Sequence, residues 1–296
     1  MRTLTFTTIF LFAAVFVWAD VLCAESGVGE KLPARNWDAF NHAQIEKLIK
    51  EYGNQNRNYD KTKPPYAVFD WDNTCIFLDI EEATFAYMLQ FIAFKATPEL
   101  LDKAIRNGVG SGNFTPEFHN LDGKPIHIDL IAADIIESYT FLYNNFGGLK
   151  GGRSFDAIRR SPHYLAFASK MRFLYDAIDA TFGHDVSYPW LTYIFAGMTE
   201  GDVKNVVQKA VEWQLKEPIE NVVWTTPAEL SGKAGRVSVT WKNGLRLVPE
   251  MQELLATLRK NGIDVWICSA SFVDVIKRIA CQPQFGYAVK ENEIIA

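Results

Sequence analysis

The chain has 296 residues, 48% of them hydrophobic and 22% charged, with 30 basic against 35 acidic side chains and a net charge of −5. This composition supports a packed core and argues against a fibre or a largely disordered protein, and the mildly acidic balance predicts that the chain does not bind nucleic acid. Four cysteines without a CxxC pair do not form a disulfide scaffold or a zinc ribbon. At roughly 150 residues per domain, the length predicts two domains or one domain with a large insertion.

The beginning of the chain is typical of an export signal. Arg2 is followed by an apolar stretch from Leu4 to Trp18, and small residues come next. The stretch is shorter than the roughly 20 residues that a membrane-spanning helix needs. We therefore expect residues 1–24 to be a signal peptide and the mature protein to be exported, periplasmic or secreted, without a stable membrane span. A retained anchor helix is the alternative.

Residues 25–78 are predicted to contain one helix and one strand. Apolar side chains recur near helical spacing over residues 37–52, and a glycine follows. A polar loop then ends at two prolines. Residues 66–69 form a short apolar run, which is typical of a buried parallel strand.

Residues 79–225 are predicted to be mostly helical and rich in aromatic side chains. Thr97 and Pro98 have the residue types of a helix N-cap and first helical residue, and Thr199 stands where a later, long helix begins. Glycine-rich stretches mark loops between these helices. We expect this segment to be a helical cap inserted after the first strand of the core.

The last part of the chain, residues 226–296, returns to an α/β pattern. Pro249 begins an amphipathic helix, and residues 263–268 form a second short apolar run. A strand, a helix and a parallel strand are connected with a right-handed crossover. The fold class that we predict is α/β, with a Rossmann-like parallel sheet between flanking helices.

Two carboxylates directly follow the first predicted strand, in the sequence Asp70-Trp71-Asp72-Asn73-Thr74. Ligands of open α/β sheets bind at the carboxyl ends of the strands. Carboxylates at that edge can bind Mg²⁺, and one of them can attack phosphorus to form an aspartyl-phosphate. The alternative is a turn with an Asx cap before a helix.

A hydroxyl group stands at the corresponding place after the second predicted strand, because residues 263–268 are followed by Ser269. A serine at the carboxyl end of a strand can donate a hydrogen bond to a phosphoryl oxygen. The alternative is the N-cap of the next helix, and one serine can fill both roles.

These two motifs together resemble motifs I and II of the haloacid dehalogenase (HAD) phosphatase superfamily. The resemblance implies that Asp70 is the nucleophile and a Mg²⁺ ligand, and that Asp72 is the general acid/base, with its backbone carbonyl on the metal. It also implies that Ser269, Thr74 and Asn73 bind or frame the phosphoryl group. Phosphoryl transfer depends on this kind of positioning and charge neutralisation.

Residues 70–82 read DWDNTCIFLDIEE, and a DNT core followed by DxEE is similar to the secreted phosphorylcholine phosphatases of bacteria, a branch near phosphoserine phosphatase. This similarity implies that Glu82 and its neighbour Glu81 lie near a quaternary ammonium group, with aromatic faces such as Tyr188 and Trp190. Each aromatic residue could equally pack in a core, and the glutamates could be favourable charges in the first turn of a helix. The expected substrate is a small phosphate monoester, phosphocholine or a similar amino-alcohol phosphate. Phosphoserine would require an arginine for its carboxylate, and the candidates are Arg106, Arg153, Arg159 and Arg160.

HAD phosphatases also use a lysine and a further acidic motif after motif II. Only residues 270–296 follow Ser269, where Lys277 comes too early and Lys290 has no acidic pair after it. We therefore expect the C-terminal part of the core, with motifs III and IV, to be missing. The alternative functions are a phosphoserine phosphatase-like enzyme and a catalytically incomplete protein that binds choline or another quaternary ammonium compound.

Overall fold

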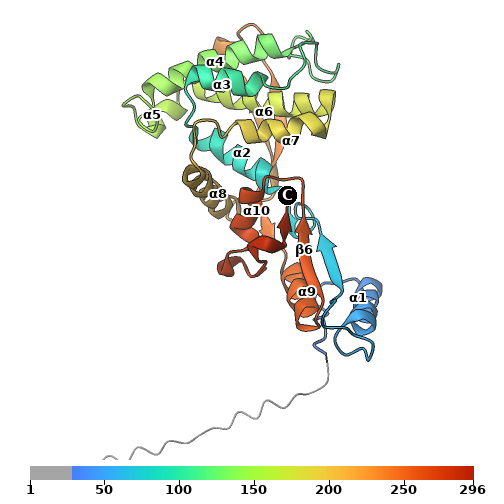
Figure 1. Ribbon diagram of the computed structural model, residues 1–296. Helices are drawn as coiled ribbons and strands as arrows, with labels where there is room; N and C mark the ends of the chain where they lie inside the picture. Colours follow the sequence, from blue (N-terminus) through green and yellow to red (C-terminus); the bar gives the residue numbers. More distant parts are fainter. Residues whose placement is uncertain (1–28) are drawn as a thin grey trace, which may run out of the picture.

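The computed structural model describes residues 29–296 (Figure 1). The predicted signal peptide, residues 1–24, lies outside the described residues, so export stays a prediction. Within residues 29–296 no helix is both long enough and apolar enough to cross a membrane.

Three parallel strands form the central sheet, in the spatial order β1 (Tyr66–Phe69), β6 (Asp264–Cys268) and β7 (Ile294–Ile295). The two apolar runs of the sequence are therefore neighbouring parallel strands, as predicted. Because they run in the same direction and in register, the chain leaves both at one edge of the sheet. Asp70 and Ser269 are the first residues after them.

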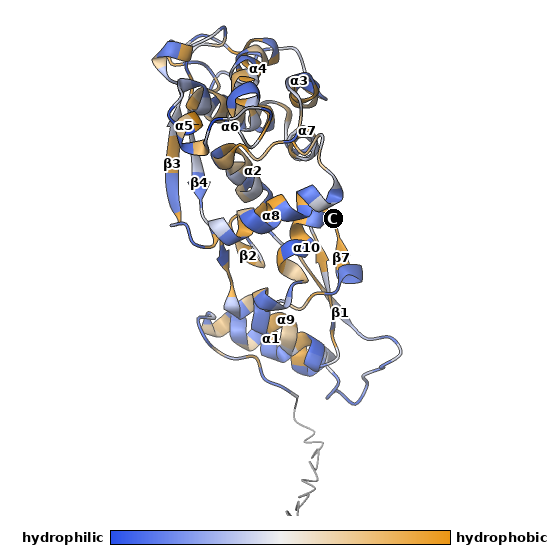
Figure 2. Cartoon of the chain, turned by 90° about the vertical axis from the view of Figure 1, so that its left-hand side faces the viewer, coloured by the Kyte–Doolittle hydropathy of each residue, from blue (hydrophilic) through white to orange (hydrophobic). Residues whose placement is uncertain are grey.

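Helices flank this sheet at the lower end of the molecule in Figures 1 and 2, where α1 (Ala39–Tyr52) and α9 (Pro249–Lys260) lie. Asp38 caps α1 by accepting hydrogen bonds from two backbone N–H groups, and Pro249 begins α9 as predicted. The amphipathic helix α10 (Val273–Ala280) follows β6. Two short 3₁₀ helices, η2 (Pro283–Phe285) and η3 (Glu291–Glu293), complete the end of the described chain.

One face of the sheet is exposed, and one edge has no partner strand among the described residues. β1 pairs only with β6 there. Tyr66, Val68 and Ile295 share a face by their register and are 70%, 52% and 57% exposed. The opposite face carries buried side chains such as Val265 and Ile267. Parallel sheets are usually covered on both faces, so this bare face is unusual.

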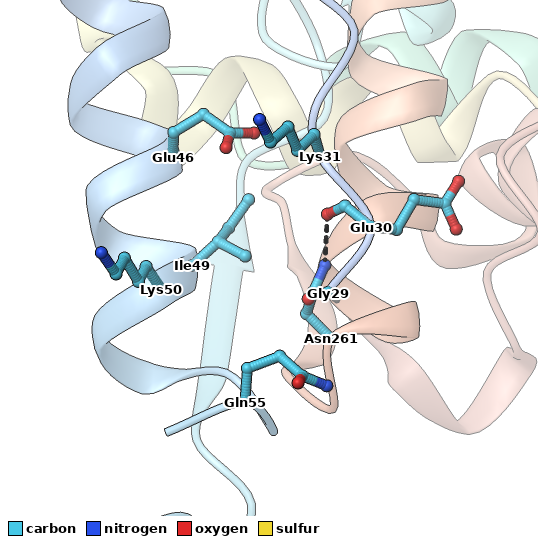
Figure 3. Close-up of a pocket in the computed structure, with 8 residues that line it drawn as sticks. All are labelled: Gly29, Glu30, Lys31, Glu46, Ile49, Lys50, Gln55 and Asn261. Atoms are coloured by element: carbon cyan, nitrogen blue, oxygen red, sulfur yellow. Dashed lines mark hydrogen bonds between the residues drawn. The ribbon is translucent and has the colours of Figure 1, made fainter. Parts of the chain in front are cut away.

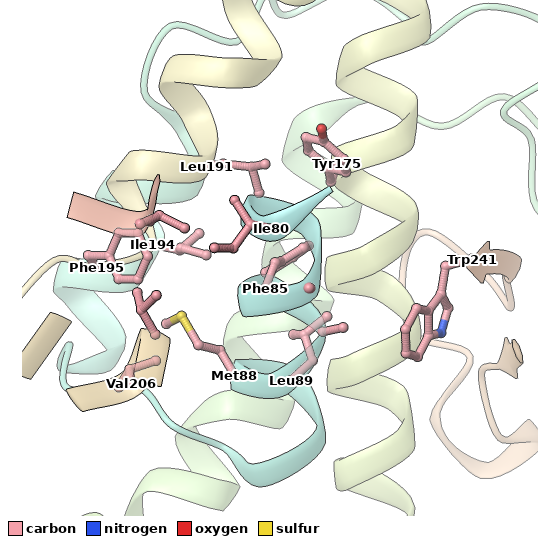
Figure 4. Close-up of a cluster of buried hydrophobic side chains, with 14 of the residues drawn as sticks. Ile80, Phe85, Met88, Leu89, Tyr175, Leu191, Ile194, Phe195, Val206 and Trp241 are labelled. Carbon is pink, nitrogen blue, oxygen red and sulfur yellow. The ribbon is translucent and has the colours of Figure 1, made fainter. Parts of the chain in front are cut away.

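Between β1 and β6 the chain forms a mostly helical unit, in the upper half of Figure 1. Its helices are α2 (Ile80–Phe91), α3 (Pro98–Arg106), α4 (Ile128–Asn145), α5 (Phe155–Arg159), α6 (Pro162–Phe182), α7 (His184–Tyr193) and α8 (Glu200–Gln214). α4 and α6 pack along each other, and α2 packs on α8. Figure 4 shows the buried side chains around α2, with Phe195 and Tyr175 on different sides of that helix.

Two antiparallel strand pairs connect the helical unit to the sheet. β3 (Glu220–Thr225) pairs with β4 (Ser238–Asn243), and the short strands β2 (Ile76–Phe77) and β5 (Arg246–Leu247) pair with each other. The 3₁₀ helix η1 (Ala228–Leu230) lies between β3 and β4.

A buried ion pair fastens the segment between β3 and β4 to the two long helices. Lys170 on α6 and Asp134 on α4 are 1% and 4% exposed, and Nζ lies 2.7 Å from Oδ2. Lys170 also donates to the backbone carbonyls of residues 230 and 231. Asp134 accepts hydrogen bonds from the backbone N–H groups of Lys233 and Ala234. Every charged atom of the pair thus has a partner, which is the condition for burying charge at a tolerable cost.

Candidate active site

The loop after β1 is held in a tight, specific shape. Asn73 and Leu78 adopt left-handed backbone conformations, with φ of 54° and 69°. Trp71 is fully buried, and its ring meets Tyr287 edge-on at 5.0 Å between centroids. The Tyr287 hydroxyl donates to the carbonyl of Cys75 at 2.6 Å. The aromatic residue between the two aspartates therefore anchors the loop in the core, and Asp70 and Asp72 line a cavity beside it.

Asp70 and Asp72 have different surroundings. The Asp70 side chain is exposed and accepts one hydrogen bond, from Thr74 Oγ1 to Oδ2 at 3.0 Å. Asp72 is mostly buried; it accepts from the Ile80 backbone N–H to Oδ1 at 2.8 Å and from Ser271 Oγ to Oδ2 at 2.7 Å. Burial raises the pKa of Asp72 to about 6, although these two hydrogen bonds oppose the shift. A carboxyl group with a pKa near neutrality can both donate and accept a proton.

The strand register brings the predicted hydroxyl to the same place. Ser269 Oγ accepts a hydrogen bond from the Ser271 backbone N–H at 3.2 Å, and both serines line a cavity with Asp70 and Asp72. Sequence reasoning missed Ser271, the residue that binds Asp72. The sequence indicates Ser271 only weakly, because it is simply a second serine two positions after Ser269, at the start of an expected helix.

The cavity at this edge has a volume of about 150 Å³ and is strongly acidic. Four of its lining residues are carboxylic acids, and no lysine, arginine or histidine lines it within the described chain. The acids and the other polar or aromatic lining residues are Asp70, Asp72, Asp79, Glu81, Asn73, Tyr175, Tyr188, Ser269 and Ser271. Burial raises the pKa of Asp79 to about 7, helped by repulsion from Asp72.

The structure brings two of the four predicted substrate-binding residues to this cavity. Glu81 lines it, is only 5% exposed, and has an Oε1 atom without a hydrogen-bond partner in the described chain. Burial raises the pKa of Glu81 to about 8. Tyr188 lines the cavity as well. Trp190 does not: it is fully buried, packs on Phe85 and donates its indole N–H to the Ile105 carbonyl.

Glu82 does not line the acidic cavity but lines an adjoining cavity of about 270 Å³. Its Oε2 accepts from Arg172 Nη2 at 2.8 Å, and the same nitrogen lies 3.0 Å from Asp176 Oδ1. The Arg172 guanidinium also lies over the Tyr175 ring, 5.1 Å from its centroid. Neither Arg172 nor Tyr175 was predicted at the site. The four predicted arginines, Arg106, Arg153, Arg159 and Arg160, line neither of the two cavities.

The side chains that could hold a metal ion at this edge of the sheet offer oxygen donors. Within the described chain no group of three or more His, Cys, Asp or Glu residues is arranged to hold a metal. Mg²⁺ nevertheless usually uses only one or two protein carboxylates and takes its other ligands from water and phosphate. Asp70 and Asp72 both line the acidic cavity, and the exposed Asp70 carboxylate is an oxygen donor that fits such an ion.

A larger hollow, of about 340 Å³, lies away from this edge and carries none of these features (Figure 3). It lies between α1 and the end of α9, where Asn261 donates to the Glu30 carbonyl at 2.8 Å. Its lysines and glutamates, Lys31, Lys50, Glu30 and Glu46, are mixed in sign. The acidic cavity is therefore the candidate active site.

Comparison with known proteins supports an α/β fold of this type and a phosphatase-like function. No family model matches the chain. Over 110 residues, 37% of the chain, it is 28% identical to a protein of Pseudomonas aeruginosa called phosphorylcholine phosphatase, and the match spans 29% of that relative's length. A solved structure of a conserved, functionally unknown protein from Anaerococcus prevotii DSM 20548 superposes with a TM-score of 0.85 and 33% identity, covering 90% of this chain and 70% of that one.

The two similarities support different statements. The solved structure fits a Rossmann-like α/β fold of the HAD type, and the curated relative supports a phosphatase-like function. With Asp70 and Asp72 after β1 and Ser269 after β6, the chain resembles the haloacid dehalogenase superfamily in its fold, and over part of its length it is similar to a bacterial phosphorylcholine phosphatase.

Proposed function

We propose that the protein is an exported, Mg²⁺-dependent phosphomonoester hydrolase that acts through an aspartyl-phosphate on phosphocholine or a similar small amino-alcohol phosphate. The observation that carries this proposal is the parallel register of β1 and β6, because it sets Asp70, Asp72 and Ser269 around one cavity. The helical unit would serve as the cap that reads the leaving group.

Each residue then has a separate task. Asp70 Oδ1, the oxygen that Thr74 leaves free, attacks phosphorus and the bond to the leaving oxygen breaks. Asp72 gives its proton to that leaving oxygen and later takes one from the water that hydrolyses the aspartyl-phosphate. Ser269 donates to a phosphoryl oxygen. Mg²⁺, held by Asp70 and the Asp72 carbonyl, would neutralise part of the phosphoryl charge.

The direct test is phosphate release from phosphocholine by purified residues 25–296, with Mg²⁺ and after chelation by EDTA. We expect release with Mg²⁺ and a loss to background after chelation, because an acidic cavity repels a phosphate dianion unless a cation offsets its charge. Restoring activity by added Mg²⁺ is the control for damage by the chelator. A folded chain that releases no phosphate with Mg²⁺ would contradict the proposal.

The leaving-group end of the cavity favours a cation. Glu81 presents an unpartnered carboxyl oxygen, and the rings of Tyr175 and Tyr188 line the same space. A quaternary ammonium group cannot donate a hydrogen bond and is instead held by aromatic faces and negative charge. Among the two predicted glutamates, the structure thus favours Glu81 over Glu82, which Arg172 already neutralises.

Choline binding should therefore strengthen as the pH rises. Below its pKa of about 8 the Glu81 carboxyl is mostly protonated and neutral, and a bound cation must first expel that proton. From pH 6.5 to 8.5 we expect the Kd of choline, measured by calorimetry, to fall by about tenfold. The Glu81→Gln variant should bind about tenfold more weakly at pH 8.5 and lose the part of this pH dependence that lies near pH 8, whereas the part near the lower pKa of Asp79, about 7, should remain. An unchanged pH profile in Glu81→Gln would remove Glu81 from the choline site.

A binding protein without turnover is the second candidate. The absence of any basic side chain from the acidic cavity, within residues 29–296, favours it because no lysine or arginine there offsets the charge of a bound phosphoryl group. Choline binding by a folded chain that releases no phosphate would decide for this candidate. An absence of binding at millimolar choline would count against it.

A further inference from the structure

The two cavities of the site differ in charge. The acidic cavity has four carboxylic acids and, within the described chain, no basic lining residue. Asn73 and Asp79 line both cavities, so the adjoining cavity of about 270 Å³ begins where the first one ends. Its lining includes Arg172 and Lys242. The positive charge that an anionic ligand needs is therefore available at this site, but beside the acidic cavity rather than inside it.

Lys242 is free to meet a ligand. It lies on β4, where alternate residues face opposite sides, and its side chain is exposed between the buried Trp241 and Asn243. Among residues 29–296 it has no ion-pair partner within 4.0 Å. A lysine side chain is a flexible stem with a mobile charge, which suits an anion that enters from solvent.

Arg172 has hydrogen-bonding capacity left over. It is 5% exposed, and Glu82 and Asp176 both bind one nitrogen, Nη2. Nε and Nη1 are buried and have no partner in the described chain, and neither has the indole N–H of Trp241 on the same wall. Most buried donors are satisfied, and a buried donor left unpaired is unfavourable. A ligand that brings oxygen acceptors would remove this deficit.

We propose that Lys242 and Arg172 form an oxyanion subsite beside the acidic cavity, which takes phosphoryl or carboxylate oxygens of the ligand. This inference rests on the proposed function, because it assigns the second half of the same site. The half-exposed Glu82 is the group that an entering oxyanion would replace on Arg172. A ligand with its phosphoryl group at Asp70 and Ser269 and its cationic group near Glu81 would carry a further anionic group, such as a carboxylate, toward Lys242.

The test is calorimetry on the whole chain with Mg²⁺, using probes that are not hydrolysed. Inorganic phosphate reports phosphoryl oxygens. Serine and ethanolamine are matched amines that differ by one carboxylate. The variant is Lys242→Gln, and the control is Lys216→Gln, which removes the same charge from a residue that lines neither cavity.

If phosphoryl oxygens occupy the subsite, we expect Lys242→Gln to weaken phosphate binding by about tenfold. If carboxylates occupy it, we expect Lys242→Gln to abolish a preference for serine over ethanolamine. Lys216→Gln should bind like the wild type. Arg172→Lys keeps the charge but loses the planar donor fork, so it should give an intermediate loss, provided that its thermal melt stays cooperative. Binding of all probes that is unchanged in Lys242→Gln, or a wild type that binds neither phosphate nor serine, would overturn the subsite.

Failure of the subsite and failure of the proposed function give different results. Mg²⁺-dependent phosphate release with probe binding unchanged in Lys242→Gln would overturn the subsite alone. Probe binding that depends on Lys242, in a chain that releases no phosphate, would support the subsite and count against the hydrolase.

Discussion

An Asp70→Asn variant should lose at least about 1,000-fold in kcat for phosphate release, because an amide oxygen is a poor nucleophile toward phosphorus. The asparagine introduced there would still accept the hydrogen bond from Thr74, and the position is exposed, so the fold should persist. The lost carboxylate would also weaken Mg²⁺ binding, which adds to the effect. Single-turnover release of phosphate from phosphocholine, with circular dichroism as the check on folding, measures this.

The matched control is Asp264→Asn. Asp264 is exposed at the opposite end of the same sheet, paired in register with Tyr66, and lines none of the cavities near the site. The control removes the same charge from the same layer, so activity should stay within about twofold of the wild type. If Asp70→Asn released phosphate as fast as Asp264→Asn, Asp70 would not be the nucleophile.

Replacing Lys170 by methionine should cost about 3–5 kcal/mol of unfolding free energy. Methionine fills similar space, but it leaves the Asp134 carboxylate buried at 4% exposure without its cation and frees the carbonyls of Leu230 and Ser231. For a chain of this size such a loss lowers the melting temperature by roughly 6–20 °C. Thermal unfolding followed by circular dichroism measures it.

An exposed ion pair supplies the comparison. Lys204 pairs with Glu200 one turn away on α8, at the surface. Solvent screens such a pair, so Lys204→Met should change the unfolding free energy far less than Lys170→Met does. Equal melting temperatures for the two variants would show that the Lys170–Asp134 pair does not hold the β3–β4 segment in place.

The strands and the central site residues could be predicted because local sequence determines them. Two short apolar runs, each followed by a polar residue, are enough to propose neighbouring parallel strands, and parallel strands place Asp70 and Ser269 at one edge. The contacts around the site could not be predicted in the same way. Arg172 and Glu82 are 90 positions apart in the sequence, and only tertiary packing brings them together.

Aromatic or acidic residues that are close in the sequence can also lie in different environments in the fold. Tyr188 and Trp190 are two residues apart, yet one lines the cavity and the other is in the core, because a helix turns by about 200° over two residues. A turn of about 100° separates Glu81 from its neighbour Glu82 in the same way. Their assignment depends on how α2 packs, which its apolar pattern leaves open because eight of its residues are buried.

The bare edge of β1 affects how the protein can be handled. An unpaired strand beside the exposed Tyr66 and Val68 offers backbone donors and acceptors, with apolar side chains next to them, to any other extended chain. Two copies of the chain can associate through this edge, and a high protein concentration favours such association. Calorimetry at high protein concentration therefore calls for light scattering on the same sample, whereas phosphate release can be followed at low micromolar concentration, where such contacts are less frequent.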